Sequence, residues 1–401
     1  MRKLLKRLGT AVLFLVVALS LAPALVPPFL DRIYYRGPVS DHFDGERFFN
    51  PGMPPPPPRR DAGRFFRRWA SDTGRAEWPE RVPVTPTVPP RRVEGEEMRV
   101  TWIGHATVLV QTQGLNILTD PVWSDRTSPA SFIGPRRVRP PGVRFEDLPK
   151  IDLVVISHNH YDHMDVATLR RLWERDRPTI VSSLGNDALL ASHGIEAVAA
   201  DWGQTIAGPT VDYYCMDEVP SHPLYEVTIE RVHHWSSRWG TDRNRALWSG
   251  FTIRLPGGNV FFAGDTGYGD GTWPRDAARN GPFRLAILPI GAYEPRDFMK
   301  THHINPDEAV SVFETLQPTM ALGMHWGTVQ LTFEPIGDPP RRLAALRRAR
   351  GIPDTRFVVT EVGRTFSVPP LAPERSAAAR RGGCGNAAAS RGSPLRRPVR
   401  R

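Results

Sequence analysis

Histidine and aspartate side chains gather in one short stretch, residues 157–165, which reads Ser-His-Asn-His-Tyr-Asp-His-Met-Asp. Imidazole nitrogens and carboxylate oxygens are the donors that zinc and related divalent ions accept in proteins. His158 and His160 are two residues apart, so their side chains can point to the same side of an extended backbone. Asp162 and His163 could face a second ion if the chain turns into a helix there. A single histidine would more often be an ordinary core or surface residue, but this density favours a metal site.

The cluster follows an apolar run, 151–156, whose short length and β-branched residues predict a buried strand. Further candidate ligands stand where other predicted strands end, and a rigid sheet can hold such side chains in fixed positions. Seven nitrogen and oxygen ligands are too many for one tetrahedral zinc with an open position, but they suit two ions that share a carboxylate. We assign His158, His160 and His234 to one ion and Asp162, His163 and His325 to the other, with Asp265 as the bridge.

The elements that position these ligands are expected between residues 98 and 370. Turn residues, apolar periodicity and capping patterns place most of them. We expect strands at 100–111 and 115–119 around Gly114, a helix at 165–174, a strand at 179–183, a helix at 186–192, and a strand at 227–232. The domain is completed by a second hairpin at 251–255 and 259–263 and a strand at 285–290. They are followed by a helix at 305–316, a helix from Asp338 to Gly351, and strands at 357–360 and 365–368.

The charge of the chain is concentrated at its two ends. The net charge is +10, but residues 1–7 carry +4 and residues 371–401 carry +7, which leaves residues 8–370 close to neutral at −1. A nucleic-acid groove would need a basic stripe on the folded domain, so we expect no nucleic-acid partner. The two cysteines, Cys215 and Cys384, provide neither a disulfide framework nor a cysteine zinc site.

The segments outside the domain suggest attachment to a membrane. Residues 8–30 carry no charge and would span roughly 34 Å as a helix, so residues 1–30 are expected to be a signal peptide or a membrane anchor, which places the protein in the cell envelope. Residues 31–97 are rich in proline and are expected to form a linker or an arm over the domain. Their amphipathic patch, 64–69, could touch lipid headgroups or pack on the domain. Residues 371–401 are expected to be a disordered, arginine-rich tail.

The chain resembles the metallo-β-lactamase superfamily, whose signature is His-x-His-x-Asp-His followed by a distal His, an Asp and a last His. Within it, the chain resembles the family of phospholipases D that hydrolyse N-acyl-phosphatidylethanolamine. The segments that carry the resemblance are 101–107, 118–123, 157–165, 234–235, 261–268 and 324–328. The resemblance extends over about residues 98–368 and implies an α/β (α+β) fold, the αββα sandwich of two mixed β-sheets flanked by helices. It also implies two divalent metal ions, with zinc as the expected identity.

The resemblance gives roles to further residues. It places the ligand directly before Trp235, which selects His234 over His233, and it makes His303 the counterpart of a histidine that lies near the acyl amide of the substrate. Asn305 stands where an acidic residue is more usual in that family, so a surface histidine near a helix cap remains the alternative for His303.

Three residues are expected to lie around the ligands. Asp120, at the end of a predicted strand, can accept the free N–H of a metal-bound imidazole, or it is a plain turn residue before Pro121. Tyr161 could lie over the cleft or only separate two ligands. For His105, at the end of an apolar strand, a structural role under the site is favoured.

The implied activity is phospholipase D-type cleavage of N-acyl-phosphatidylethanolamine to phosphatidic acid and an N-acylethanolamine, with Asp162 and Asp265 orienting the nucleophile. The expected partners are a phospholipid substrate and a membrane surface, and a homodimer is left open. One alternative is a hydrolase of a soluble lactone or of a cyclic or nucleic-acid phosphodiester. Another is a non-catalytic, membrane-tethered metal-binding protein, against which the complete set of seven ligands argues.

Overall fold

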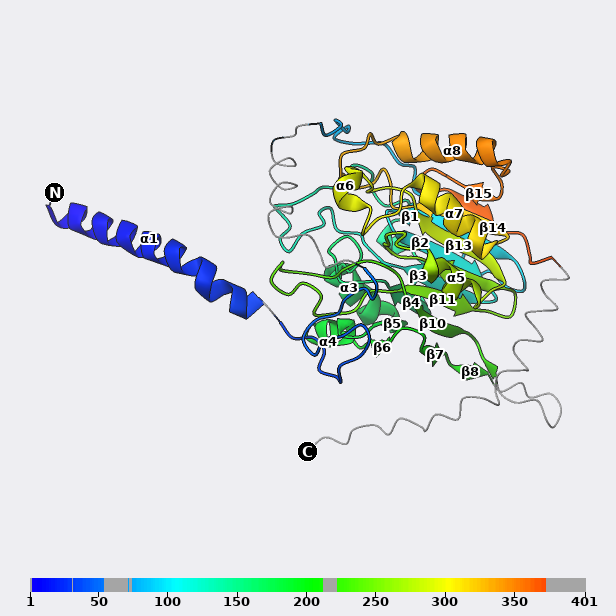
Figure 1. Ribbon diagram of the computed structural model, residues 1–401, viewed down its shortest axis with the longest axis horizontal. Helices are drawn as coiled ribbons and strands as arrows, with labels where there is room; N and C mark the ends of the chain where they lie inside the picture. Colours follow the sequence, from blue (N-terminus) through cyan, green and yellow to red (C-terminus); the bar gives the residue numbers. More distant parts are fainter. Residues whose placement is uncertain (1, 31, 54–70, 72–73, 212–221, 373–401) are drawn as a thin grey trace.

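The computed structural model describes residues 2–30, 32–53, 71, 74–211 and 222–372, and all structural statements below refer to these residues. Two seven-stranded sheets face each other in the domain, with helices on their outer faces (Figure 1). This arrangement confirms the expected sandwich of two mixed sheets flanked by helices. One helix, α1 (Arg2–Leu30), lies apart from the sheets (Figure 1).

The first sheet carries the strand that leads into the histidine cluster. Its order is β16 (Thr365–Ser367), β1 (Met98–Gly104), β2 (Thr107–Thr112), β3 (Leu115–Thr119), β4 (Leu153–Ile156), β5 (Thr179–Ser183) and β6 (Val198–Ala200). The strands from β16 to β3 pair antiparallel, and those from β3 to β6 pair parallel. Leu153–Ile156 is buried on both faces, as expected for an apolar strand inside a sheet.

The second sheet leads into the other predicted ligands. Its order is β15 (Phe357–Val358), β14 (Met320–Met324), β13 (Phe283–Pro289), β12 (Asn259–Phe262), β11 (Gly250–Arg254), β10 (Glu226–Glu230) and β7 (Thr205–Ala207). Parallel pairing joins β12 to β15, and antiparallel pairing joins β7 to β12. A small separate ladder pairs β8 (Thr210–Val211) with β9 (His222–Pro223).

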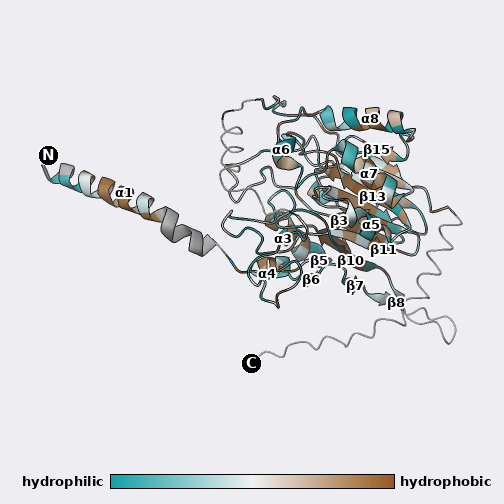
Figure 2. Ribbon diagram, in the orientation of Figure 1, coloured by the Kyte–Doolittle hydropathy of each residue, from teal (hydrophilic) through white to brown (hydrophobic). Residues whose placement is uncertain are grey.

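Apolar side chains fill the space between the sheets and the space under the helices. Many residues of the strands are hydrophobic, as their brown colour in Figure 2 shows. The helices are α3 (Val166–Asp176), α4 (Asn186–Ala191), α5 (Thr272–Ala278), α6 (Arg296–Met299), α7 (Pro306–Leu316) and α8 (Asp338–Arg350), with one 3-10 turn, η1 (Phe145–Asp147). Leu169 and Leu172 of α3 pack under the first sheet, whereas Val310 and Phe313 of α7 pack on the second.

Local sequence explains where two of these helices begin. Asp165 caps α3 by accepting hydrogen bonds from the amides of residues 167 and 168. Asn305 and Glu308 form the capping box of α7, in which each side chain accepts from the backbone amide of the other. Because the cap of α3, Asp165, is the last residue of the stretch 157–165, it also ends the histidine cluster at a fixed point.

One expectation about the elements was wrong in detail. The strand expected at 100–111 is two strands, because the chain turns at His105 with a φ of 55°. Within the proline-rich segment, Phe43 and Phe48 are 1% exposed and belong to the core between the sheets. The sequence offered little sign of this packing, because the two aromatic residues lie among turn residues without strand or helix periodicity.

The membrane expectations for the ends of the chain stay predictions. Among the described residues, no helix combines the length and the apolar character that a bilayer crossing demands. Large apolar side chains on α1 are nevertheless exposed, among them Phe14 at 74% and Leu8 at 63%. The amphipathic patch at 64–69 and the tail at 373–401 lie outside the described residues.

Candidate metal centre

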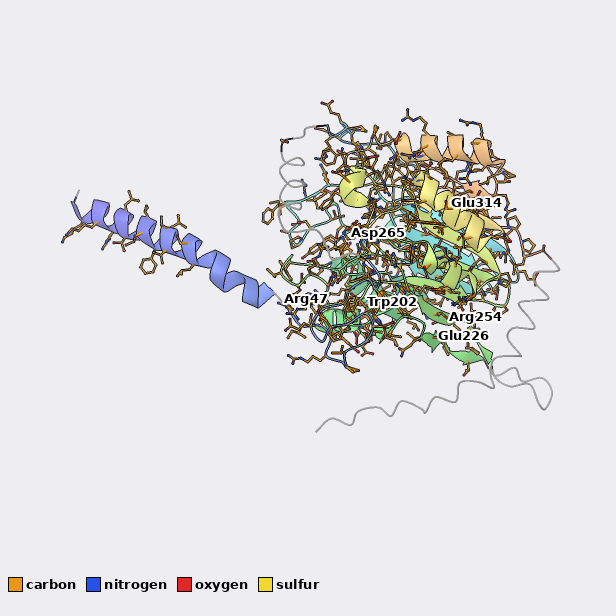
Figure 3. The ribbon with its side chains drawn as sticks, in the orientation of Figure 1. Arg47, Trp202, Glu226, Arg254, Asp265 and Glu314 are labelled. Atoms are coloured by element: carbon orange, nitrogen blue, oxygen red, sulfur yellow. The ribbon has the colours of Figure 1, made fainter. Side chains whose placement is uncertain are left out.

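The seven predicted ligands meet in the interior of the domain, where Figure 3 labels Asp265. Each comes from a loop directly after a strand: the cluster follows β4, His234 follows β10, Asp265 follows β12 and His325 follows β14. Hydrogen-bonded neighbours fix each of these strands, so the side chains beyond their ends start from fixed positions. The farthest pair, His158 and His325, is thereby brought into one site from opposite sheets.

Three histidines form the first group of donor atoms. His158 Nε2 lies 2.8 Å from His160 Nδ1, which lies 3.4 Å from His234 Nε2. His234 Nε2 is in turn 3.9 Å from Asp265 Oδ2. His158 and His234 are buried, and His160 is half-buried, so the group is closed on one side and reachable on the other. These are the three histidines that we assigned to one ion.

The second group lies on the other side of Asp265. His163 Nε2 is 3.0 Å from Asp265 Oδ2, 3.2 Å from His325 Nε2 and 3.4 Å from Asp162 Oδ2. His325 Nε2 is 3.2 Å from Asp265 Oδ1 and 3.6 Å from Asp162 Oδ2. The two oxygens of Asp265 therefore lie among donors of both groups, as a bridging carboxylate requires.

The spacing of the second group fits a tetrahedral ion. Four donors at the usual zinc distances, about 2.0–2.1 Å, would lie about 3.3–3.4 Å from one another. The separations among His163 Nε2, His325 Nε2 and Asp162 Oδ2 run from 3.2 to 3.6 Å. The contacts to Asp265 are 3.0 Å to Oδ2 and 3.2 Å to Oδ1. Nitrogen and carboxylate oxygen donors at this spacing are a suitable set for zinc. The first group offers the same kinds of donor, and the separations between its donor atoms cover a wider range, 2.8–3.9 Å.

Hydrogen bonds behind the ligands fix which ring nitrogen faces the site. Asp120, fully buried, lies 2.6 Å from His163 Nδ1 and accepts from both the amide and the hydroxyl of Ser157. The carbonyl of His302 lies 2.9 Å from His234 Nδ1. Each contact places the N–H on Nδ1 and leaves Nε2 free to bind a metal. The expected role of Asp120 thus has the right geometry, whereas His302 was not foreseen, because a backbone carbonyl leaves no sign in the sequence.

His105 also belongs to the site, in a more direct way than we expected. Its Nε2 lies 2.9 Å from Asp162 Oδ2, and its ring packs on the ring of His325 with centroids 3.9 Å apart. The break between β1 and β2 turns this side chain inwards. The single strand expected at 100–111 runs through residue 105, so this turn and the contact with Asp162 were not foreseen.

Burial and neighbouring charges divide the imidazoles into two electrostatic classes. Burial lowers the pKa of His160 to about 3 and holds the pKa of His158 and His234 well below its ordinary value. Burial opposes charge on His325 too, but the carboxylates of Asp265 and Asp162 outweigh it and raise its pKa to about 9. The first group is therefore neutral and ready to bind a metal at neutral pH, whereas His325 must give up a proton first.

His303 and Tyr161 complete the set of predicted residues. His303 Nδ1 lies 3.9 Å from Asp265 Oδ2, and burial lowers its pKa to about 4, so it is a neutral imidazole beside the bridging carboxylate. The Tyr161 ring lies under the Arg238 guanidinium, 3.6 Å away, and lines a separate cavity rather than the donor groups. The expectation that Tyr161 covers the cleft is not supported by this position.

Comparison with known proteins agrees with this geometry. Residues 115–326 match the model of the beta-lactamase superfamily domain. The chain belongs to the metallo-β-lactamase superfamily. Over 280 residues it is 39% identical to N-acyl-phosphatidylethanolamine-hydrolyzing phospholipase D 1 of Caenorhabditis elegans, a match that covers 66% of this chain and 74% of that protein. It also belongs to the family that this nematode protein represents, as expected from its motifs.

Two further comparisons extend the relationship. The mitochondrial N-acyl-phosphatidylethanolamine-hydrolyzing phospholipase D of Saccharomyces cerevisiae is 32% identical over 268 residues, which cover 66% of this chain and 55% of that protein. The structure of isothiocyanate hydrolase from Delia radicum gut bacteria superposes with a TM-score of 0.52 and 16% identity, covering 68% of this chain and 100% of that one. The last match shows the shared metallo-β-lactamase fold alone. The chain is thus a metal-dependent hydrolase of this superfamily.

Proposed function

We propose that this metallo-β-lactamase-fold hydrolase uses two zinc ions to hydrolyse a phosphodiester, N-acyl-phosphatidylethanolamine, in the manner of a phospholipase D. The observation that carries the proposal is the position of Asp265 between the two donor groups. His158, His160 and His234 would hold one ion, and Asp162, His163 and His325 the other. When bound, such a pair of ions lowers the pKa of a water molecule between them and neutralises charge on a phosphoryl group.

The residues of the chain would orient the reacting groups. His105 Nε2 lies 2.9 Å from Asp162 Oδ2 and fixes the position of this carboxylate beside the donor groups. Asp265 is held on both sides by imidazoles, which keep its pKa well below the ordinary value despite its burial. Both carboxylates therefore stay ionised at neutral pH, and either can hold the proton that the water loses.

His303 would act on the substrate rather than on the water. It is a neutral imidazole, and its Nδ1 has no hydrogen-bond partner among the described residues. The guanidinium of Arg296 donates to the His303 carbonyl, 2.8 Å away, and pairs with Glu308 of the α7 cap, so the backbone is fixed. A fixed neutral imidazole can donate one hydrogen bond to a phosphoryl or amide oxygen of the substrate.

The reaction balances with water as the only co-reactant. The water oxygen forms a new bond to phosphorus, and the bond from phosphorus to the ethanolamine oxygen breaks. The leaving oxygen takes up a proton, and the products are phosphatidic acid and an N-acylethanolamine. The substrate class is supported by relatives at 39% and 32% identity that carry this activity in their names.

The test uses the purified full chain with zinc and N-acyl-phosphatidylethanolamine in mixed micelles. We expect phosphatidic acid and an N-acylethanolamine as products, and loss of both in Asp265→Asn. Asp354→Asn is the matched control, because Asp354 is exposed and belongs neither to the donor groups nor to the cavity beside Tyr161. Turnover of a lactone or a soluble diester without turnover of the phospholipid would refute the proposed substrate and leave the hydrolase assignment in place.

A further inference from the structure

A loop on the surface of the domain presents two large apolar side chains to solvent. Phe132 is 83% exposed and Ile133 is 59% exposed, and Phe132 is the most exposed large apolar side chain of the described residues. Large apolar side chains at such exposure cost solvation free energy unless something covers them in use. Isolated examples are common on proteins, so the surroundings of this pair decide its meaning.

Backbone and side-chain hydrogen bonds fix the base of this loop, residues 127–134. Arg126 and Arg136 form an antiparallel bridge, and the amide of Thr127 donates to the carbonyl of Pro135 over 3.1 Å. The Arg126 guanidinium donates across the loop to the carbonyl of Gly134 at 2.5 Å. The loop thus projects its apolar tip from a fixed stem.

A cationic cavity of about 440 Å³ lies beside this loop. Three arginines line it: Arg32, Arg126 and Arg238. Neither Arg32 nor Arg126 forms an ion pair with a carboxylate in the part of the chain that the structure describes. Asp125 and Asp165 also line the cavity, but Asp125 pairs with Arg136, and Asp165 caps α3. Among the described residues, the charges of Arg32 and Arg126 beside the apolar tip are therefore not neutralised by a carboxylate.

The cavity is built partly by the loop that carries the metal ligands. Tyr161 and Met164 line it, and the Arg238 guanidinium stacks on the Tyr161 ring and donates to the carbonyls of Asn159 and Met164 over 3.0 and 2.8 Å. Trp239, which is 40% exposed, stands at the same wall. One face of the ligand loop thus holds the donor atoms, and the other face forms the cavity.

The N-terminal helix enters the domain at this same place. Arg32, which lines the cavity, follows α1 after a single residue, so the end of α1 lies within about 7 Å of the cavity wall along the chain. The hydroxyl of Tyr34 fixes the entry point by donating to Asp242 over 2.9 Å. The end of α1 and the loop therefore both adjoin this cavity.

We propose that this surface, defined by Phe132, Ile133, Trp239, Arg32, Arg126 and Arg238, docks the domain onto a bilayer that contains anionic phospholipid. The apolar tip enters the headgroup boundary, as apolar side chains of peripheral proteins do, and the arginines contact lipid phosphates. A bilayer satisfies both features, whereas a soluble anion would leave the tip exposed. Docking through this face places the ligand loop next to the membrane surface.

The experiment measures amide hydrogen exchange of the loop in the full chain, with no substrate present, so its outcome is separate from that of the activity assay. The protein is compared alone, with phosphatidylcholine vesicles, and with vesicles that also contain phosphatidylglycerol. We expect exchange at residues 127–134 to slow about tenfold on the anionic vesicles and less on the neutral ones. Binding by α1 alone would protect α1 but not this loop.

Two pairs of variants sharpen the test. Phe132→Ser with Ile133→Ser should abolish the protection, and Arg32→Glu should remove its dependence on phosphatidylglycerol. Val88→Ser and Arg348→Glu are the matched controls, because both residues are exposed and lie outside the proposed surface. Equal exchange with and without vesicles would overturn the proposal. Protection that rises with protein concentration in the absence of lipid would also overturn it, because a second copy of the chain would then cover the loop.

Discussion

Replacing Asp120 by asparagine should weaken one metal site and spare the other. Asp120 Oδ2 lies 2.6 Å from His163 Nδ1, and Oδ1 accepts from the amide of Ser157 at 2.7 Å. An asparagine that keeps the second contact presents its NH₂ group to His163 Nδ1. The imidazole must then carry its proton on Nε2, the nitrogen that faces the site, where it cannot bind a metal.

The expected loss is about 10–100-fold in affinity for the ion held by Asp162, His163 and His325, or about 1.4–2.8 kcal/mol. The ion held by His158, His160 and His234 should bind as before. Zinc titration against a chelator of known affinity, followed by metal analysis, would show one site weakened. Asp354→Asn is the control, and near-identical thermal unfolding of both variants with excess zinc would confirm folding. Two sites of unchanged affinity in Asp120→Asn would refute the role of Asp120.

Three further predictions concern protons and the substrate. Because Asp265 raises the pKa of His325 to about 9, zinc uptake at pH 7–8 should release protons, and calorimetry in buffers of different ionisation enthalpy should show the release fading above pH 9. His42 is held between Asp201 and Asp41, which raise its pKa against the effect of burial, so its stabilisation is complete below about pH 6.5 and is lost as pH rises through the higher folded value. The difference in unfolding free energy between wild type and His42→Gln should therefore shrink with rising pH, and a constant difference would contradict this. His303→Phe should lower kcat about 10²-fold with both metals retained, and a change in KM alone would point to a binding role.

The ligands could be predicted from the sequence because each stands next to a recognisable strand. The run 151–156 is apolar and short, and the same is true of the strands before Asp265 and His325. In a sheet, side chains just past such strands have few possible positions, so residue type and place together indicate a shared site. The bridging role of Asp265 followed from counting ligands. The structure places its Oδ2 3.0 Å from His163 Nε2 and 3.9 Å from His234 Nε2.

What escaped prediction depends on contacts between distant segments. His105 lies 57 residues from Asp162 in the sequence, and Gly104, with a φ of 132°, is the local mark of the turn that brings them together. Phe43 and Phe48 also escaped prediction, because they enter the core between the sheets from a proline-rich segment. The local sequence pattern indicates strands and helices through their periodicity. These residues are instead placed by tertiary packing, which can override local preference.

Three turns at the candidate metal centre share a strained backbone conformation, a positive φ at a residue other than glycine. His105, Asp120 and His325 have φ values of 55°, 31° and 63°, in the left-handed region that side chains with a Cβ seldom adopt. Such conformations cost about 1–3 kcal/mol each and persist only where the surroundings fix them. Here the fixing contacts join the two sheets, since the His325 amide donates to the His105 carbonyl at 3.1 Å and the His105 amide donates to Thr328 at 2.9 Å. Glycine at these positions would remove the backbone strain, but it would also remove the side chain that the turn directs into the site. The strain is therefore retained at these three turns, where the side chain is a predicted metal ligand or contacts one.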